Sequence, residues 1–169
     1  MINQNSYISN PHNVCVIGDG MSNFLSIAVG INFGNKLVSI NFPEVLMNDL
    51  ILLMRLGIVS SEVKIAQNKG VLSTYLNDTE TRIILIAAAN STAVADCGID
   101  LFVNICSFQE MTIPTINTYF DLIKSNSAMF YCCNREEKVL YGGETIILDQ
   151  YPWGKCDVVL DEECPWNKF

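Results

Sequence analysis

The chain has 169 residues, half of them hydrophobic and only 17% charged, and its net charge is −8. This length suits one domain with a substantial core, and the scarcity of charged residues suits a sheet that is covered on both faces. The acidic balance and the scattered lysines and arginines argue against binding to nucleic acid, which needs a basic stripe to neutralise phosphates.

Strands and helices alternate along the predicted chain after a loose segment at residues 1–12. The predicted strands comprise residues 14–17, 36–40, 82–88, 100–105 and 128–132. The predicted helices comprise residues 22–33, 44–56 and 112–124, and residues 60–78 form either a helix or a mixed segment. Ser22 can cap the first helix and Gly34 can end it, while Pro43 and Pro114 suit the first turns of the later helices.

The end of the chain has a different pattern, typical of paired antiparallel strands. Gly142 and Gly143 predict a hairpin turn between strands at residues 138–141 and 145–148, and residues 157–160 predict a last strand. Alternating strands and helices imply a parallel sheet with right-handed crossovers. We therefore predict a single α/β domain over residues 1–169, Rossmann-like, with a mostly parallel sheet, helices on both faces and an antiparallel C-terminal edge.

Cysteine usage and the apolar runs predict a cytoplasmic protein. The seven cysteines are odd in number and form no C-x-x-C pair, which favours free thiols in a reducing compartment. A zinc site would need histidines or paired cysteines at ligand spacing, and His12 is the one histidine, so we expect no metal. The residues after Met1 are polar, unlike a signal peptide, and the apolar run at residues 83–89 is too short to span a bilayer.

A glycine turn follows the first predicted strand and indicates a nucleotide-like cofactor. Gly18, Asp19 and Gly20 let the backbone turn tightly and approach a ligand closely. Asn23 stands where a dinucleotide fingerprint requires its third glycine, and the chain has no triphosphate-binding loop. The turn is closer to one that binds S-adenosylmethionine, which has no pyrophosphate.

Asn41 ends the second predicted strand, about 20 residues past the glycines, where a side chain often binds the ribose of a cofactor. Its amide can accept a hydrogen bond from one ribose hydroxyl and donate to another. Asn41 can equally be a turn residue ahead of Phe42 and Pro43. An acidic residue would bind a ribose more strongly, because charge-assisted hydrogen bonds are stronger.

Several short motifs, in the expected order over nearly the whole chain, resemble class I S-adenosylmethionine-dependent methyltransferases, and more narrowly the bacterial sugar O-methyltransferase family. The matching segments are residues 16–20, 40–46, 100–104, 107–111 and 151–153, together with Tyr131, Asn134 and Arg135. The family usually carries an acid where Asn41 stands. It also usually has a longer region before the first strand, which helps to cover the acceptor pocket and is short or absent here.

The resemblance implies a site beyond the carboxyl ends of the strands, where ligands of open α/β sheets bind. The residues expected to contact the cofactor are Gly18, Asp19, Gly20, Asn41, Ala89, Asn90 and Asn104. The residues expected to contact the acceptor are Ser107, Gln109, Asn134, Arg135, Tyr151 and Trp153. Glu110 follows the fourth expected strand of that sheet and is the candidate base that takes the hydroxyl proton.

Each of these residues also has an ordinary structural explanation. Glu110 can balance a helix dipole, and Arg135 can pair with a neighbouring glutamate on the surface. Tyr151 and Trp153 can pack in a small aromatic core. Asn104 can form hydrogen bonds inside the sheet.

The function implied by the resemblance is transfer of a methyl group from S-adenosylmethionine to a sugar hydroxyl, in the synthesis of a polysaccharide or glycolipid precursor. The alternative is a degenerate domain of the same fold that binds a ligand or partner without catalysis, which Asn41 and the short leading segment favour. A nicotinamide-dependent oxidoreductase is disfavoured by the incomplete glycine pattern. The expected partners are a small-molecule or sugar substrate, and a homodimer is an open alternative to a monomer.

Overall fold

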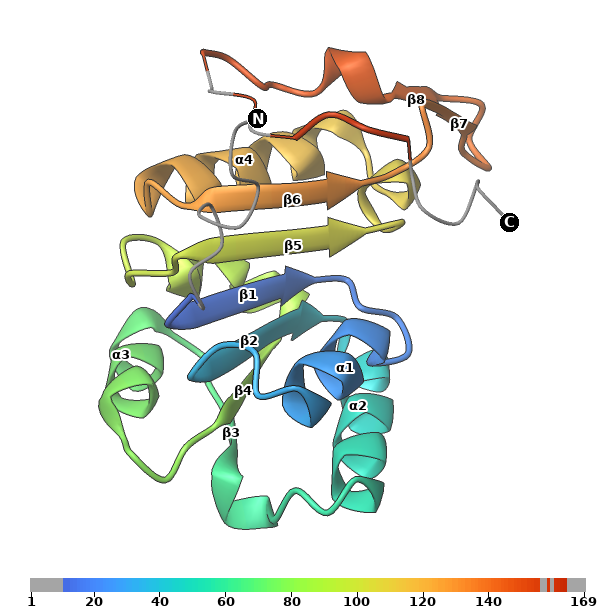
Figure 1. The fold of residues 1–169 in the computed structure, drawn as a ribbon. Coiled ribbons are helices and arrows are strands. Elements are labelled where there is room, and N and C mark those ends of the chain that lie inside the picture. Colours follow the sequence, from blue (N-terminus) through green and yellow to red (C-terminus); the bar gives the residue numbers. More distant parts are fainter. Residues whose placement is uncertain (1–10, 156–157, 159, 164–169) are drawn as a thin grey trace, which may run out of the picture.

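The computed structural model describes residues 11–155, 158 and 160–163, and its centre is an open sheet of six parallel strands (Figure 1). The strands run in the spatial order β3-β4-β2-β1-β5-β6, and every pairing in this sheet is parallel. Their bounds are β1 (Asn13–Ile17), β2 (Lys36–Asn41), β3 (Val63–Ile65), β4 (Ile83–Ala87), β5 (Leu101–Ile105) and β6 (Met129–Cys133).

Helices pack on both faces of this sheet and build two separate apolar cores (Figure 1). One face is covered by α1 (Asn23–Gly30) and α2 (Pro43–Arg55). The other is covered by α3 (Lys69–Asn77), the 3-10 helix η3 (Ala88–Val94) and α4 (Ile113–Ser125). Successive strand residues face opposite cores, as with Leu37 and Val38, and this is why the central strands are apolar at nearly every position.

The order of the strands places a topological switch point beside β1. The chain passes from β1 to β2 on one side, and after β4 it returns through η3 to β5 on the other side of β1. Loops that leave the carboxyl ends of β1 and β5 therefore diverge, and open α/β sheets bind ligands in the crevice formed there. The prediction of an α/β domain with a mostly parallel sheet is confirmed.

The predicted C-terminal hairpin is present, but the prediction that it forms an antiparallel edge of the main sheet is wrong. Strands β7 (Glu137–Val139) and β8 (Thr145–Ile147) pair with each other in a separate two-stranded sheet. The reason is packing, because Ile146 is buried in the core on the α4 side, so the hairpin folds over the end of the domain. The strand predicted at residues 157–160 includes positions 157 and 159, which lie outside the described residues.

The two helix ends on the α1–α2 side show how local chemistry sets the boundaries. Gly57, with φ of 85°, ends α2 as predicted. The first helix ends earlier than predicted, because Asn32 adopts a left-handed φ of 53° and Phe33 N donates to Ala28 O at 2.8 Å. This is a Schellman-type ending with asparagine in place of glycine, and the chain then enters β2 at Lys36.

The uncertain segment at residues 60–78 is mixed, and comprises the 3-10 helix η2 (Ser60–Glu62), strand β3 and helix α3. Two further 3-10 helices, η4 (Phe108–Glu110) and η5 (Leu148–Gln150), follow β5 and β8. Cys15, Cys97, Cys106 and Cys132 are free thiols, as predicted, while Cys156 and Cys164 lie outside the described residues. None of the helices in the described region of the chain combines the length and the apolar character needed to cross a bilayer.

Candidate functional site

The glycine turn after β1 has one packed half and one open half. Gly18 and Gly20 have left-handed φ angles of 70° and 58°. A Cβ atom at Gly18 would lie 2.4 Å from Ser107 Oγ, whereas a Cβ atom at Gly20 would have no neighbour within 4 Å among the residues that the structure describes. Gly18 N also donates to Ile40 O at 2.9 Å, which holds the turn against the end of β2. A ligand can therefore approach the turn closely at Gly20, on the side that is not occupied by Ser107.

Asp19 caps the first turn of α1. Its two carboxylate oxygens accept hydrogen bonds from Phe24 N and Leu25 N, both at 2.9 Å. These amides are the groups that bind phosphate in a dinucleotide site, where a helix N-terminus attracts an anion. In this protein the anion is supplied by the chain itself, and this disfavours a ligand whose pyrophosphate must sit at this helix.

A second carboxylate is buried near the first. Asp49 of α2 accepts hydrogen bonds from Ser22 Oγ at 2.5 Å and from Ser39 Oγ at 3.5 Å, and its side chain has no solvent exposure. Burial raises the pKa of Asp49, and the two serine hydroxyls oppose the rise. Burial likewise raises the pKa of Asp19 to about 6, and the charge of Asp49 adds to that rise.

Asp19 gives the stability of the domain a specific pH dependence. Its pKa is about 6 in the folded protein and about 4 in the unfolded chain, so between these values only the folded state holds the proton. The free energy of unfolding should therefore fall by about 1 kcal/mol from pH 5 to pH 7 in the wild type, relative to Asp19→Asn. Urea unfolding of both proteins at the two pH values measures this difference, and parallel pH profiles would contradict the assignment.

Asn41, at the carboxyl end of β2, has a buried donor with no partner. The side chain is 7% exposed, and its Oδ1 accepts a hydrogen bond from Phe42 N at 3.0 Å. Among the described residues, no group accepts a hydrogen bond from its Nδ2. A buried donor without an acceptor costs about 1–3 kcal/mol, so such a group in a native fold calls for an explanation. A ligand hydroxyl at this position would supply the acceptor.

Small side chains lie next to Asn41 at the same edge of the sheet. Asn41 is in register with Ala87, the last residue of β4, and Ala88, Ala89 and Asn90 follow in η3. Ala89 is exposed, and Asn90 is half-buried. The carboxyl ends of β1, β2 and β4 thus combine an open glycine, an amide nitrogen without a partner among the described residues, and a short alanine run.

The residues predicted to form a site at the end of β5 and in the loop after it lie close together, but their polar groups form hydrogen bonds with one another. Asn104 is fully buried and donates through Nδ2 to Ile17 O at 3.0 Å and to Ser107 Oγ. Its Oδ1 accepts from Phe108 N at 3.2 Å and from Asn134 Nδ2 at 2.7 Å. This network fastens the loops after β5 and β6 to the end of β1 and occupies the polar groups of Asn104.

Gln109 has a similar structural role, since it ties the loop after β5 to the loop after β6. Its backbone N donates to Asn134 Oδ1 at 3.2 Å, and its side-chain oxygen accepts from Arg135 N at 2.8 Å. Gln109 is 5% exposed, whereas Arg135 is exposed. Of the side chains predicted to bind an acceptor, Arg135 is therefore the one best placed to meet a ligand from solvent.

Glu110 lies at the rim of an open hollow. Its Oε1 is 3.0 Å from Lys138 Nζ, and both residues line a space of about 540 Å³ together with Tyr141 and Gly142. Met111, next in the chain, comes within 3.8 Å of the position that a Cβ atom at Gly18 would take, so η4 and its flank lie beside the glycine turn. Sequence reasoning missed Lys138, because nothing in its local pattern shows that the hairpin folds back to Glu110.

Tyr151 and Trp153 belong to an aromatic cluster. Tyr151 is 4% exposed, its ring is 6.0 Å from that of Phe108 and 5.9 Å from that of Trp153, and burial raises its pKa to about 12. Trp153 Nε1 donates to Leu148 O at 2.9 Å, and its ring meets Phe120 edge-on. These rings pack the chain after β8 against α4. Tyr151 therefore lies in the core on the α4 side.

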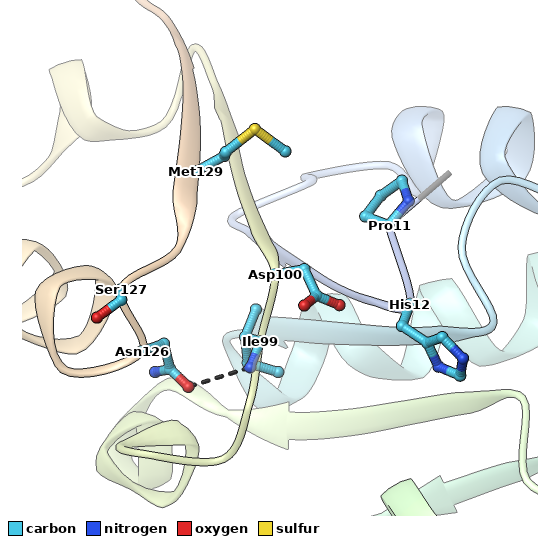
Figure 2. Close-up of a pocket in the computed structure, with 7 residues that line it drawn as sticks. All are labelled: Pro11, His12, Ile99, Asp100, Asn126, Ser127 and Met129. Carbon is cyan, nitrogen blue, oxygen red and sulfur yellow. Dashed lines mark hydrogen bonds between the residues drawn. The ribbon is translucent and has the colours of Figure 1, made fainter. Parts of the chain in front are cut away.

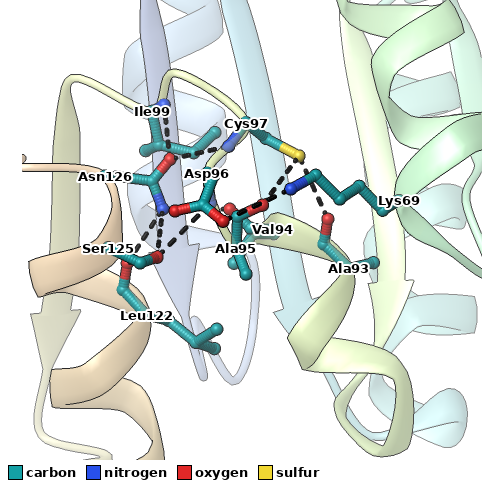
Figure 3. A network of polar contacts seen from close by, with 10 residues as sticks. All are labelled: Lys69, Ala93, Val94, Ala95, Asp96, Cys97, Ile99, Leu122, Ser125 and Asn126. Carbon is teal, nitrogen blue, oxygen red and sulfur yellow. Dashed lines mark hydrogen bonds and ion pairs between the residues drawn. The ribbon is translucent and has the colours of Figure 1, made fainter.

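A second hollow, of about 350 Å³, lies at the opposite edge of the sheet (Figure 2). It is bordered by residues at the amino ends of β1, β5 and β6: Pro11, His12, Ile99, Asp100, Asn126, Ser127 and Met129. Asn126 accepts hydrogen bonds from Cys97 N and Ile99 N and donates to Val94 O, and Lys69 pairs with Asp96 nearby (Figure 3). These contacts anchor the loop into β5, far along the strands from the glycine turn.

No family model, curated protein or solved structure matches the chain. The proposed function therefore rests on the residues at the carboxyl edge of the sheet and on the resemblance of the sequence motifs.

Proposed function

We propose that the carboxyl ends of β1, β2 and β4 bind S-adenosylmethionine, and that the domain transfers its methyl group to a sugar hydroxyl. The observation that carries the proposal is the buried, unpartnered Nδ2 of Asn41. A ribose hydroxyl would accept its hydrogen bond and remove the cost of leaving that donor unpaired. The open side of the turn at Gly20 gives the same ligand a close approach to the backbone.

Asp19 distinguishes this cofactor from a dinucleotide. Its carboxylate already accepts the amide hydrogen bonds of the first turn of α1, so a pyrophosphate would have to displace it. S-adenosylmethionine has no phosphate and makes no such demand. Its ammonium group is cationic, and the carboxylate of Asp19, which lies in the glycine turn, would interact more favourably with a cation than with an anion.

The hollow beside Glu110 is the proposed acceptor site. Bound S-adenosylmethionine supplies a methyl group on a sulfonium centre, which a hydroxyl oxygen can attack. Glu110 would accept a hydrogen bond from that hydroxyl and take its proton, a role that typically contributes about 10²–10⁴-fold. Lys138, paired with Glu110 at 3.0 Å, holds the carboxylate in position at the rim of the hollow. The sugar as acceptor rests on the resemblance of the motifs.

A second candidate is a domain of the same fold that binds without catalysis, and one feature favours it. Asn104 and Ser107 satisfy each other and Ile17 O at the switch point, so the β5 side of the glycine turn is closed by side chains. A cofactor there could reach only the Gly20 side. Methyl transfer to a nucleotide sugar, followed with a labelled methyl group, separates the two candidates, because only the enzyme gives a labelled product.

Asn41 provides the direct test of the cofactor site. Calorimetry of the wild type should show binding of S-adenosylmethionine and S-adenosylhomocysteine and none of NAD. Asn41→Ala should weaken binding at least 10-fold, the loss of about one hydrogen bond, and Asn41→Asp should strengthen it because a carboxylate accepts more strongly from ribose hydroxyls.

Asn48→Ala, an exposed substitution on α2, is the matched control and should leave the affinity unchanged. Equal affinities of the wild type and Asn41→Ala would remove Asn41 from the site. Failure of the wild type to bind either adenosine compound would overturn the proposed function.

A further inference from the structure

An apolar surface covers the outer side of the two helices α1 and α2. Helix α1 contains no charged residue. Ile27 on this helix and Ile31 at its C-cap are four residues apart, and both are exposed to solvent. On α2 the exposed apolar side chains are Met47, Ile51 and Met54, which recur at the spacing of one helical face. Met21 and Phe42 extend this surface toward the glycine turn, and we call the seven residues together the α1–α2 face.

The seven side chains lie on one side of the sheet. Both helices pack their inner residues into the same core, through Leu25 of α1 and Leu53 of α2. Ser22, at the start of α1, donates to Asp49 in the middle of α2, so the two helices adjoin, as Figure 1 shows. A helix that is apolar on its inner and outer sides alike is typical of an element buried on both sides.

The size of the face argues for a stable interface. Its members are between 47% and 77% exposed. Side chains of this size with such exposure present on the order of 800 Å² together, more than the ~300–600 Å² of the largest patch on a typical monomer. The same area is what one partner contributes to an interface of standard size, roughly 800 Å².

The charge pattern indicates what covers this face. The protein carries a net charge of −8, so most of its surface repels a second copy. The stretch from Gly20 to Asn35 contains no charged residue at all, and the exposed charged residues of α2, Glu44 and Arg55, lie at its two ends and have opposite signs. A partner with a large charge of one sign would find no matching group of charges here, whereas a second copy brings the same surface, in which one acidic and one basic residue balance each other.

We propose that the α1–α2 face is the interface of a homodimer. A two-fold axis uses the same patch on both subunits, so the helices of one copy pack on those of the other and close the assembly. Methionines at Met21, Met47 and Met54 suit such a self-matching contact, because their flexible side chains adapt to each other. The interface borders the proposed cofactor site at Met21 and Phe42, and it stands independently of the proposed function.

Sedimentation velocity of the full chain between about 1 and 100 µM tests the proposal. The wild type should sediment as a dimer. Met47→Glu combined with Ile51→Glu should raise the dissociation constant of the dimer at least 100-fold, because the interface would then bury two glutamates from each subunit beside those of the other. Val139→Glu is the matched control, because Val139 is 58% exposed, like Met47 at 59%, but lies on the hairpin.

A wild type that stays monomeric over this range would overturn the proposal, and so would a double variant that dimerises as tightly as the wild type. Circular dichroism and urea unfolding of the variants establish that they are folded, as expected for substitutions at exposed positions. A wild type that is monomeric alone, but binds a separate protein through this face, would assign the face to a different partner and would equally refute the dimer.

Discussion

Replacing Gly18 with alanine should destabilise the domain by about 2–5 kcal/mol, the largest effect that we expect from a single methyl group here. Some of the cost comes from the backbone, because a left-handed φ of 70° is unfavourable for any residue with a Cβ atom. The rest comes from a clash, since the new atom would lie 2.4 Å from Ser107 Oγ and 2.6 Å from Ser107 Cβ. Urea unfolding of Gly18→Ala beside the wild type measures the loss.

Two further proteins separate these causes. Gly20→Ala has a similar φ of 58° and no neighbour within 4 Å, so it should lose only about 1–2 kcal/mol. Ser107→Gly removes the atoms that clash, so the double variant Gly18→Ala/Ser107→Gly should lose less stability than the two single changes added together. Equal losses in Gly18→Ala and Gly20→Ala would show that Ser107 does not pack against the turn as described.

Asn104→Ala should cost about 3–4 kcal/mol in the free energy of unfolding, even though it removes no apolar packing. The side chain has no solvent exposure and bridges three segments, through Ile17 O, Phe108 N and Asn134 Nδ2. Its removal breaks hydrogen bonds to Ile17 O, Ser107 Oγ, Phe108 N and Asn134 Nδ2, each with a net value of about 0.5–1.5 kcal/mol, and takes away the acceptor of Phe108 N. Chemical denaturation and the melting temperature both report the change.

Asn48→Ala, an exposed asparagine on α2, is the reference and should change stability by less than about 0.5 kcal/mol. Asn104→Asp tests the donor side of the network separately, because a carboxylate can accept a hydrogen bond from Phe108 N but cannot donate one to Ile17 O. It should therefore destabilise the domain as strongly as alanine does. A tolerated Asn104→Asp would mean that the donor half of this network contributes little.

The repeating elements of the fold were predictable from the sequence, because they depend on local patterns. Apolar runs bounded by glycine, proline and asparagine mark the five longer strands, and Pro43 and Gly57 mark the ends of α2. The parallel pairing of the main sheet follows from the alternation of strands and helices, whereas the strand order β3-β4-β2-β1-β5-β6 was not predicted. Strand β3 is only three residues long, too short for its alternation to distinguish it from a helical segment.

The side-chain contacts at the candidate site were less predictable, since they join residues far apart in the sequence. Asp19 was predicted to contact a cofactor, and in the structure its carboxylate accepts hydrogen bonds from the first turn of α1. Whether Asn104 faces a ligand or the core depends on Ser107 and Asn134, whose positions are set by two separate loops. The separate sheet of the hairpin arises from one buried residue, Ile146, which a local pattern cannot distinguish from an edge-strand residue.

The central position of β1 has a consequence for biosynthesis. One long edge of this strand pairs with β5, and Asn104 follows Ile17 by 87 residues along the chain. At a translation rate of about 5–20 residues per second, the nascent chain holds that apolar edge unpaired for roughly 4–17 s. An exposed strand edge is a template for association with other chains, so the growing polypeptide is most in need of a chaperone during this interval.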